Sequence, residues 1–384
     1  MINSAQFTRR HFLNLSAALG LSAPHVAFAK GIENKRFIFV LLRGGMDGLS
    51  ALIPTDNRIN ALRGTLIKDP SSNLEINSDF SLHPAFKTLK ALYDAKEASF
   101  IHAAGTTYRE RSHFDAQDFL EILGGGQFND GWMNRVLRHI DQDIDQDGLA
   151  LARSIPLALQ GEAKVSNWSP SIFDQVSPDI LDRISNLCSD DIELANALGS
   201  ARANNVENMS INRRASRRFI LDYPIALEAI GRIMSKDDGP GIGMTALNGW
   251  DTHVNQINEH NVKFEKLDNG FRALKEQLGN KWEQTCVVVC SEFGRTVAVN
   301  GTRGTDHGTG GLIMLLGGAI AGGKVSGDWP GLKRTDLYHG RDLAPVNDVT
   351  AVLKGVVRDH LGISRNKLDK TIFPNSDRAF DGLI

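Results

Sequence analysis

Residues 37–42 read Phe-Ile-Phe-Val-Leu-Leu, and residues 43–50 continue as Arg-Gly-Gly-Met-Asp-Gly-Leu-Ser. The first segment is apolar at every position, as expected for a strand that is buried on both faces of a parallel sheet. The second segment begins with an arginine and two glycines, as expected for a loop at the end of such a strand. Ligands of parallel sheets covered by helices bind beyond the carboxyl ends of the strands. This stretch therefore predicts both the fold class and the edge of the sheet where a site lies.

Three further apolar runs have the same character and alternate with helical patterns. The strand-like runs are residues 98–104, 285–290 and 312–316. Helical periodicity is present in residues 84–95, 114–123, 132–140, 220–235, 260–278 and 349–361. Strands that alternate with helices indicate an α/β fold, a three-layer α/β/α sandwich with a mostly parallel central sheet. No repeat or low-complexity linker divides the chain, so we expect a single domain.

The composition excludes several classes of protein. The chain has 384 residues, and its hydrophobic fraction of 41% is too high for a disordered chain. Its 43 basic and 45 acidic residues give a net charge of −2, which argues against a nucleic-acid partner bound by a dense cationic face. Three cysteines are too few for a disulfide-stapled fold. We therefore expect a large domain that is stabilised by its core.

The first 29 residues have the layout of an export signal. Residues 8–13, Thr-Arg-Arg-His-Phe-Leu, resemble the twin-arginine consensus, and residues 27–29, Ala-Phe-Ala, resemble a cleavage site. The apolar stretch between them is too short to span a hydrocarbon core of about 30 Å. We predict export by the twin-arginine translocase and a mature domain, residues 30–384, in the periplasm or otherwise outside the cytoplasm, without a membrane span. The alternative is an amphipathic start to a cytoplasmic domain.

Polar residues of the kinds found in catalytic and metal sites follow the predicted strands or lie in nearby glycine-containing segments. In chain order they are Arg43, Asp47, Ser112, His113, Asp251, His253, Glu292, Arg295, Asp306 and His307. Because the carboxyl ends of parallel strands meet at one edge of a sheet, we expect these side chains to gather there.

Six of these residues are candidate metal ligands, because carboxylates and imidazoles together suit divalent ions. They are Asp47, Asp251, His253, Glu292, Asp306 and His307. We expect one or two ions, of Zn, Mn, Mg or Ca. The alternative for Asp251 is a helix cap, and the alternative for Asp306 is a hydrogen bond within a turn.

The remaining four residues, Ser112, His113, Arg43 and Arg295, are the candidate catalytic residues. Ser112 precedes a predicted helix, where a hydroxyl is either a nucleophile favoured by the helix dipole or an ordinary N-cap. The two arginines either bind substrate oxyanions or pair with Asp47 or Glu292. The sequence alone leaves each of these alternatives open.

Four segments together resemble the bacterial domain-of-unknown-function 1501 family, many of whose members carry twin-arginine signals. The segments are Leu-Arg-Gly-Gly-Met-Asp-Gly-Leu-Ser (42–50), Trp-Asp-Thr-His (250–253), Ser-Glu-Phe-Gly-Arg-Thr (291–296) and Gly-Thr-Asp-His-Gly (304–308). The family is related to the alkaline phosphatase and sulfatase superfamily, whose members place two divalent metals and a Ser, Thr or Cys-derived nucleophile at the carboxyl edge of a parallel sheet.

The resemblance implies an alkaline-phosphatase-like fold and an exported, metal-dependent hydrolase of small phosphate or sulfate esters. Asp47 resembles the first-strand metal ligand of the superfamily, and Ser112 lies near the place of its nucleophile. Phe293 stands where the superfamily commonly has a ligand histidine, which leaves a one-metal site or a degenerate one open. The alternative function is a non-catalytic periplasmic protein that binds a glycan, an anion or a protein partner.

Overall fold

The computed structural model describes residues 35–64, 66–67, 69–124, 128–140, 148–169 and 222–384. The predicted export signal, residues 1–29, lies outside the described residues and stays a prediction. Among the helices that are described, none is long and apolar enough to cross a membrane.

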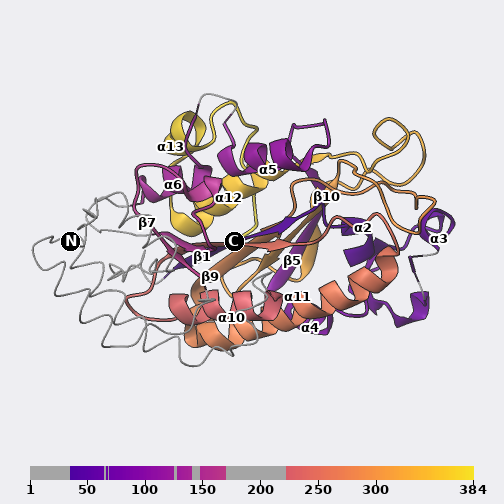
Figure 1. The fold of residues 1–384 in the computed structure, drawn as a ribbon, viewed down its shortest axis with the longest axis horizontal. Helices are drawn as coiled ribbons and strands as arrows, with labels where there is room; N and C mark the ends of the chain where they lie inside the picture. The colour runs from indigo at the N-terminus through magenta and orange to yellow at the C-terminus, as the bar shows by residue number, and fades with distance from the viewer. Residues whose placement is uncertain (1–34, 65, 68, 125–127, 141–147, 170–221) are drawn as a thin grey trace, which may run out of the picture.

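A mixed, mostly parallel sheet forms the centre of the molecule (Figure 1). Its strands run in the order β11-β5-β10-β9-β1-β8-β6-β7, and β12 also pairs with β5. Their bounds are β1 Arg36–Arg43, β5 Ala98–Gly105, β6 Gly148–Leu151, β7 Val165–Trp168, β8 Ile242–Asn248, β9 Thr285–Cys290, β10 Gly311–Leu316, β11 Lys324–Ser326 and β12 Asn347–Asp348. Within this sheet β10 is antiparallel to both of its neighbours, and the other described pairs are parallel.

Helices cover both faces of the sheet, so the predicted three-layer sandwich is confirmed (Figure 1). One layer contains α5 His113–Ile122, α6 Trp132–Leu137, α12 Val349–Leu361 and α13 Arg365–Lys367, and the other contains α4 Lys87–Asp94, α10 Tyr223–Met234 and α11 Gln256–Leu278. A small sheet of β2 Leu52–Pro54, β3 Leu74–Glu75 and β4 Phe80–Leu82 lies in the segment that also forms α2 Gly48–Ala51 and α3 Arg58–Arg63.

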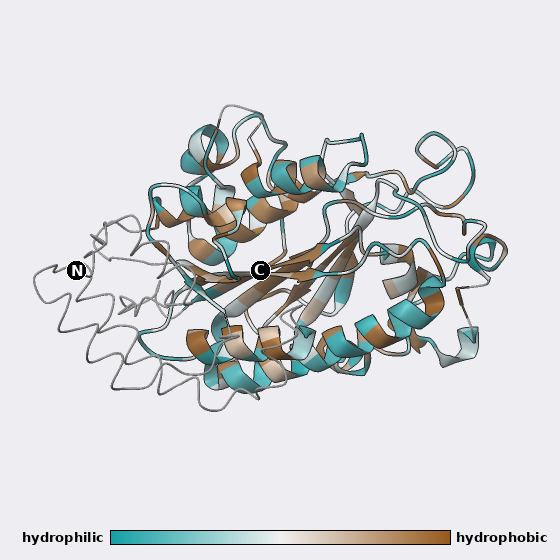
Figure 2. Ribbon diagram, in the orientation of Figure 1, coloured by the Kyte–Doolittle hydropathy of each residue, from teal (hydrophilic) through white to brown (hydrophobic). Residues whose placement is uncertain are grey.

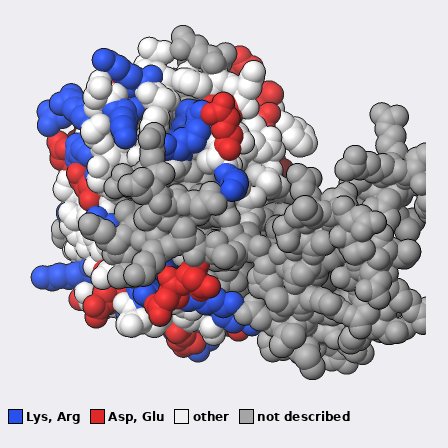
Figure 3. Space-filling model, turned by 90° about the vertical axis from the view of Figure 1, so that its left-hand side faces the viewer, with Lys and Arg blue, Asp and Glu red and all other residues white. Residues whose placement is uncertain are grey.

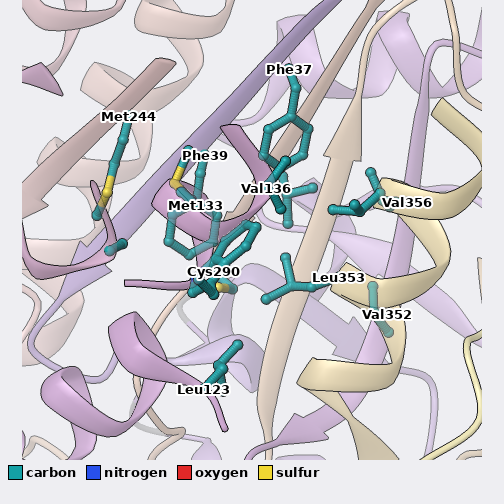
Figure 4. Close-up of a cluster of buried hydrophobic side chains, with 14 of the residues drawn as sticks. Phe37, Phe39, Leu123, Met133, Val136, Met244, Cys290, Val352, Leu353 and Val356 are labelled. Atoms are coloured by element: carbon teal, nitrogen blue, oxygen red, sulfur yellow. The ribbon is translucent and has the colours of Figure 1, made fainter. Parts of the chain in front are cut away.

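The central strand β1 divides the core between the two layers, because successive side chains of a strand point to opposite faces. Phe37, Phe39 and Leu41 pack in the cluster that includes α6 and α12 residues, part of which Figure 4 shows. Ile38 and Val40 pack in the cluster with α4, α10 and α11. Figure 2 accordingly shows apolar strands between helices whose outer faces are hydrophilic. Burial on both faces explains why this strand is apolar throughout.

Two features of the sheet differ from the sequence-based expectation. The strand β8 was missed, since Gly243 and Thr245 interrupt its apolar pattern; a Cβ at residue 243 would lie 2.6 Å from the Met234 sulfur, so packing requires glycine there. The expected parallel pairing of residues 312–316 is wrong. The chain leaves β9 and re-enters the sheet as β10 at the same edge, without a helical crossover, so β10 runs antiparallel.

The charged surface agrees with the near-neutral balance of the chain. On the end of the molecule that Figure 3 shows, basic and acidic side chains are both present in the described part. Ion pairs such as Arg138 with Glu162 and Arg358 with Asp381 neutralise many of the surface charges.

Replacement of Trp132 by alanine tests the core between β1 and the α5–α6–α12 layer. The indole is fully buried and packs against the rings of Phe37, Phe39 and Phe373 at centroid distances of 6.1, 5.4 and 5.6 Å. We expect Trp132→Ala to lower the free energy of unfolding by about 3–5 kcal/mol, measured by chemical denaturation. The exposed Val262 provides the control, since Val262→Ala should change it by less than about 0.5 kcal/mol. A loss below about 1 kcal/mol for Trp132→Ala would contradict this account of the core.

Candidate metal centre

Three parallel strands and one antiparallel strand bring the candidate residues to one edge of the sheet. The carboxyl ends of β9, β1 and β8 lie side by side, because Leu41 pairs with Cys290 and Arg43 pairs with Asn248. The loops that follow them carry residues 44–47, 249–253 and 291–296. Because β10 is antiparallel, the segment before it, residues 304–310, reaches the same edge. The close approach of the loops depends on Gly44 (φ +118°), where a Cβ would lie 2.5 Å from the Asp251 backbone nitrogen.

Three imidazoles converge on one oxygen of Asp251. Asp251 Oδ1 lies 3.2 Å from His113 Nε2, 2.8 Å from His253 Nε2 and 3.1 Å from His307 Nε2. The Nε2 atom of His307 is also 3.0 Å from the Nε2 atoms of His113 and His253. The donor atoms of His113, Asp251 and His307 all lie within 4.8 Å of one another. We call these four residues the histidine cluster.

The outer nitrogen of each imidazole faces a hydrogen-bond acceptor. His113 Nδ1 lies 2.6 Å from Glu292 Oε1, His307 Nδ1 lies 2.9 Å from the Arg111 carbonyl oxygen, and His253 Nδ1 lies 3.3 Å from Asp306 Oδ1. Because a carbonyl or carboxylate oxygen accepts a hydrogen bond, the Nδ1 atom that faces it is the donor. Each neutral ring therefore carries its proton on Nδ1. The lone pairs of the three Nε2 atoms therefore face one another and Asp251.

A cation is the group that fits this arrangement. One proton can satisfy one of the inner contacts, whereas a metal ion satisfies all of them. Tetrahedral coordination at about 2.0–2.1 Å separates neighbouring ligand atoms by roughly 3.3 Å, close to the contacts observed in the histidine cluster. Hydrogen bonds from the outer ring nitrogens to carboxylates and carbonyls are typical of metal-binding histidines. His113, Asp251 and His307 could hold the ion, and His253 lies next to them, with its Nε2 atom near Asp251 and His307.

Glu292 and Asp306, two of the predicted ligands, orient histidines of the cluster instead. Glu292 is buried, and its oxygens accept hydrogen bonds from the His113 ring, the Gln117 amide at 2.9 Å, the Gly44 N–H at 2.9 Å and the Ser291 hydroxyl at 2.9 Å. Three of these donors, those of His113, Gln117 and Gly44, point at the same oxygen, Oε1, and fix the carboxylate beside His113. Asp306 accepts from the Asn300 amide at 3.1 Å and lies beside the outer nitrogen of His253.

Asp47, another predicted ligand, belongs to a separate buried network. Its carboxylate forms an ion pair with Arg63 of α3 and accepts hydrogen bonds from the Ser50 hydroxyl at 2.9 Å and the Gln256 amide at 2.6 Å. Burial raises the pKa of Asp47, but the charge and hydrogen bond of Arg63, with the charge of His260 and the hydrogen bond of Ser50, together bring the pKa to about 2. The ion pair with Arg63 makes Asp47 a structural anion. The oxygen of Gln256 accepts a hydrogen bond from Thr252, so this network also supports the loop that carries Asp251.

The two predicted oxyanion-binding arginines differ in how far the protein uses their guanidinium groups, since Arg43 Nε has no hydrogen-bond partner among the described residues and the Arg43 side chain is 32% exposed. Arg295 is buried and donates to the carbonyl oxygens of residues 44, 45, 250 and 305 and, at 2.6 Å, to Asp251 Oδ1. It positions Asp251 and does not face a substrate. Arg43 pairs with Glu121 at 2.5 Å, instead of with Asp47 or Glu292. The contacts of Arg295 thus favour its structural alternative, whereas the role of Arg43 stays a prediction.

Ser112 begins α5 beside the histidine cluster. Its backbone is extended (φ −84°, ψ 125°), and its carbonyl oxygen accepts the hydrogen bond of Ala116 N–H, as in an N-cap. The side chain makes no capping hydrogen bond, and its hydroxyl has no partner among the described residues. The next residue, His113, belongs to the cluster. The hydroxyl is therefore available at a helix N-terminus, where an anion is favoured.

The charges of the cluster are coupled. Burial raises the pKa of Asp251, but the hydrogen bond and charge of Arg295, with the charges of His113 and His253, lower it to about 2. Burial opposes protonation of His113, yet the hydrogen bond and charge of Glu292, with Asp251, raise its pKa above the ordinary value of 6.5. Burial lowers the pKa of His307. Asp251 is thus ionised near neutral pH. At His113, protons compete with a metal ion for the ring in the same pH range.

Phe293 forms an apolar wall under the cluster. Its ring centroid lies 4.7 Å from that of His113 and 5.2 Å from that of His307, and the side chain is buried. An apolar ring at this position supplies no ligand, and the described residues contain a single potential metal cluster. The described residues thus contain one candidate site for an ion.

A family model described as Protein of unknown function (DUF1501) matches residues 34–372. The chain belongs to this family. No curated protein sequence matches this DUF1501 chain. It is similar to the solved structure of Ps i-CgsB in complex with k-i-k-neocarrahexaose, with a TM-score of 0.41 and 11% identity over 87% of this chain and 74% of that chain. It is also similar to the lipoteichoic acid synthase LtaP from Listeria monocytogenes, with a TM-score of 0.32 and 10% identity over 94% of this chain and 81% of that chain. Such distant likeness assigns no activity.

Removal of a cluster ligand from the DUF1501 chain tests metal binding. We expect Asp251→Ala and His307→Ala to weaken the binding of Zn²⁺ at least about a hundredfold, because each removes a ligand atom. Metal content after dialysis and the Zn²⁺-dependent shift in Tm measure the effect. His139, whose charged neighbours are Arg138 and Lys367, provides the control, and His139→Ala should bind Zn²⁺ like the wild type. Equal zinc binding by all three variants would contradict the proposed cluster.

Replacement of Glu292 by glutamine tests the orientation and charge of His113. A metal binds neutral imidazole, so zinc affinity should fall as the pH is lowered through the raised pKa of His113. In Glu292→Gln the charge that raises this pKa is absent, so the fall should shift to lower pH, while affinity at about pH 8 weakens about 10–100-fold. Without metal, protonated His113 stabilises the wild-type fold fully below about pH 6.5, and this contribution is lost as the pH rises through its folded pKa. Zinc titrations at a series of pH values from below pH 6.5 to about pH 8 provide the measurement, and Glu283→Gln is the control. Identical pH profiles of zinc affinity for wild type and Glu292→Gln would refute the role of Glu292.

Proposed function

We propose that this DUF1501 chain is a metal-dependent hydrolase of phosphate or sulfate esters. The observation that carries the proposal is the unpartnered hydroxyl of Ser112, which lies at the N-terminus of α5 and next in sequence to His113 of the histidine cluster. A hydroxyl, a helix N-terminus and a cation site at one place are the parts that attack on a phosphorus or sulfur centre requires.

The chain's own residues would hold the metal and the attacking group. His113, Asp251 and His307, with His253, would bind one divalent ion, for which the donor set favours Zn²⁺. When bound, such an ion supplies Lewis acidity at an ester oxygen. Arg295 holds Asp251 in place, and Glu292 holds His113. Ser112 would attack the phosphorus or sulfur atom of the ester as the bond to the ester oxygen breaks, and the alcohol would leave with the serine proton. Water would then hydrolyse the serine ester, which restores the Ser112 hydroxyl and releases phosphate or sulfate. The N-terminus of α5 would stabilise the charge that develops on the transferred group.

The open side of the histidine cluster admits a small anionic ester. The side chains of Asp251 and His253 are 45% and 39% exposed, whereas Arg295 and Glu292 behind them are fully buried. A substrate would therefore approach the exposed side of Asp251 and His253, while Arg295 and Glu292 remain shielded from water. If the predicted twin-arginine signal directs export, the substrate is met in the periplasm; that localisation stays a prediction of the sequence.

A second candidate, a non-catalytic periplasmic protein that binds an anion or a glycan, is favoured by Phe293. Phe293 stands where the resemblance to the superfamily implies a ligand histidine, and its ring lies against His113, so among the described residues this position offers no second ligand set. Both candidates use the same cluster. The two candidates differ in whether the Ser112 hydroxyl attacks a bound ester and the ester is hydrolysed.

Replacement of Ser112 by alanine distinguishes the two candidates. We expect the zinc-loaded protein to hydrolyse an aryl phosphate or an aryl sulfate, and Ser112→Ala to lower kcat more than about a hundredfold with unchanged zinc content. Ser364, which begins α13 and also makes no side-chain cap, provides a matched control, and Ser364→Ala should keep full activity. Zinc-loaded protein without activity on either ester would overturn the hydrolase proposal and support the binding protein.

A further inference from the structure

Two arginines that the sequence patterns did not single out lie beside the histidine cluster. Arg111 directly precedes Ser112, and Arg341 lies in the segment between β11 and β12. Both pair with Asp342: Arg111 Nη2 lies 2.7 Å from Asp342 Oδ2, and Arg341 Nη1 lies 3.2 Å from Asp342 Oδ1. One carboxylate thus holds two guanidinium groups together.

Both arginines also contact His307 through its backbone or ring. The carbonyl oxygen of Arg111 accepts the hydrogen bond of His307 Nδ1, and Arg341 Nη2 donates to the His307 carbonyl oxygen at 3.0 Å. Arg341 also lies close enough to Asp306 for its charge to lower the pKa of that carboxyl, after the larger effects of Asn300 and His253. The pair is therefore built onto the same residues that form the metal centre.

The arginines are exposed, whereas their common partner is not. The side chain of Asp342 is 0% exposed, and those of Arg111 and Arg341 are 30% and 42% exposed. Within the described part of the chain, Arg111 Nη1 and Arg341 Nε have no hydrogen-bond partner. Donors on both guanidinium groups thus remain for a ligand from solvent.

The backbone at Arg111 is held in a conformation that side chains rarely adopt. Its φ is +62°, in the left-handed region, which is unfavourable for a residue other than glycine. The ion pair with Asp342 and the hydrogen bond from His307 hold it there. The strained residue directly precedes Ser112 in the sequence, and backbone strain of this kind is concentrated at functional sites.

The balance of charge around the centre depends on the metal. With neutral histidines, the charged groups are three arginines and four carboxylates, which leaves a net charge of −1; they are Arg111, Arg295, Arg341, Asp251, Glu292, Asp306 and Asp342. A divalent cation changes this to +1. An anion is therefore repelled from the metal-free centre and attracted to the loaded one.

We infer that Arg111 and Arg341 bind the oxygens of a tetrahedral oxyanion, phosphate or sulfate, and do so only when a divalent cation occupies the histidine cluster. The inference rests on the proposed function. In the ester substrate of that function, one atom would face the metal ion and the oxyanion would bind the two arginines. Guanidinium groups suit this task, because their planar forks match the oxygens of phosphate and sulfate.

Isothermal titration with inorganic phosphate and, separately, inorganic sulfate tests the inference without any turnover. Zinc-loaded protein should bind at least one of the two anions, and protein stripped with EDTA should bind it at least about tenfold more weakly. The anion that binds more tightly identifies the class of ester. Arg341→Gln and Arg111→Gln should each weaken anion binding about 10–100-fold, since each removes a charged hydrogen-bond donor, and should leave zinc affinity within about threefold of the wild type.

Two further variants exclude trivial explanations. Arg341→Lys keeps the charge but loses the fork, so it should restore part of the affinity. Arg378→Gln removes an equal charge from a side chain that is 75% exposed, and it should bind the anion like the wild type. Anion binding that is equal in Arg341→Gln, Arg111→Gln and wild type overturns the inference even if ester hydrolysis is observed. Anion binding that is as tight without zinc overturns the linkage to the metal. A protein that binds no zinc overturns both the inference and the proposed function.

Discussion

The buried guanidinium of Arg295 is the interaction on which the site depends. It joins the carbonyl oxygens of the loops after β1 and β8 to the Asp251 carboxylate, and its own backbone lies in the loop after β9. A buried charge without partners is very costly, so the loops can close only around a fully bonded arginine. The position of Asp251, and through it the convergence of the three histidines, follows from that requirement.

The other charged side chains of the site form contacts in which one partner is buried and the other is exposed. Buried Glu292 orients His113, and buried Asp342 holds Arg111 and Arg341, while the functional side chains face solvent. This separation lets the orienting groups act in a region of low dielectric constant, where hydrogen bonds are strong, and leaves the ligand-binding atoms accessible.

Much of the fold and part of the site could be predicted from the sequence. The apolar run of β1 and the glycine-containing loop after it correctly indicated the sheet. Asp251 and His307, each in a short segment with a carboxylate and an imidazole, lie close together in the fold, and their role as ligands stays a prediction. The direction of β10 could not be predicted, because it is set by a return of the chain at the same edge. In the sequence, Glu292 and Asp47 resemble metal ligands. In the fold, Glu292 pairs with His113 and Asp47 pairs with Arg63, and these partners, distant in the chain, decide their roles.

The central claim, that imidazoles of the histidine cluster and Asp251 hold one metal ion, is tested most directly by X-ray absorption at the zinc edge of the loaded protein. The account predicts nitrogen and oxygen ligands at about 2.0–2.1 Å, with imidazole scattering from at least two histidines. This imidazole signal should weaken in His307→Ala and stay unchanged in His139→Ala. A zinc shell composed of water or carboxylate oxygens alone, without imidazole scattering, would contradict the account.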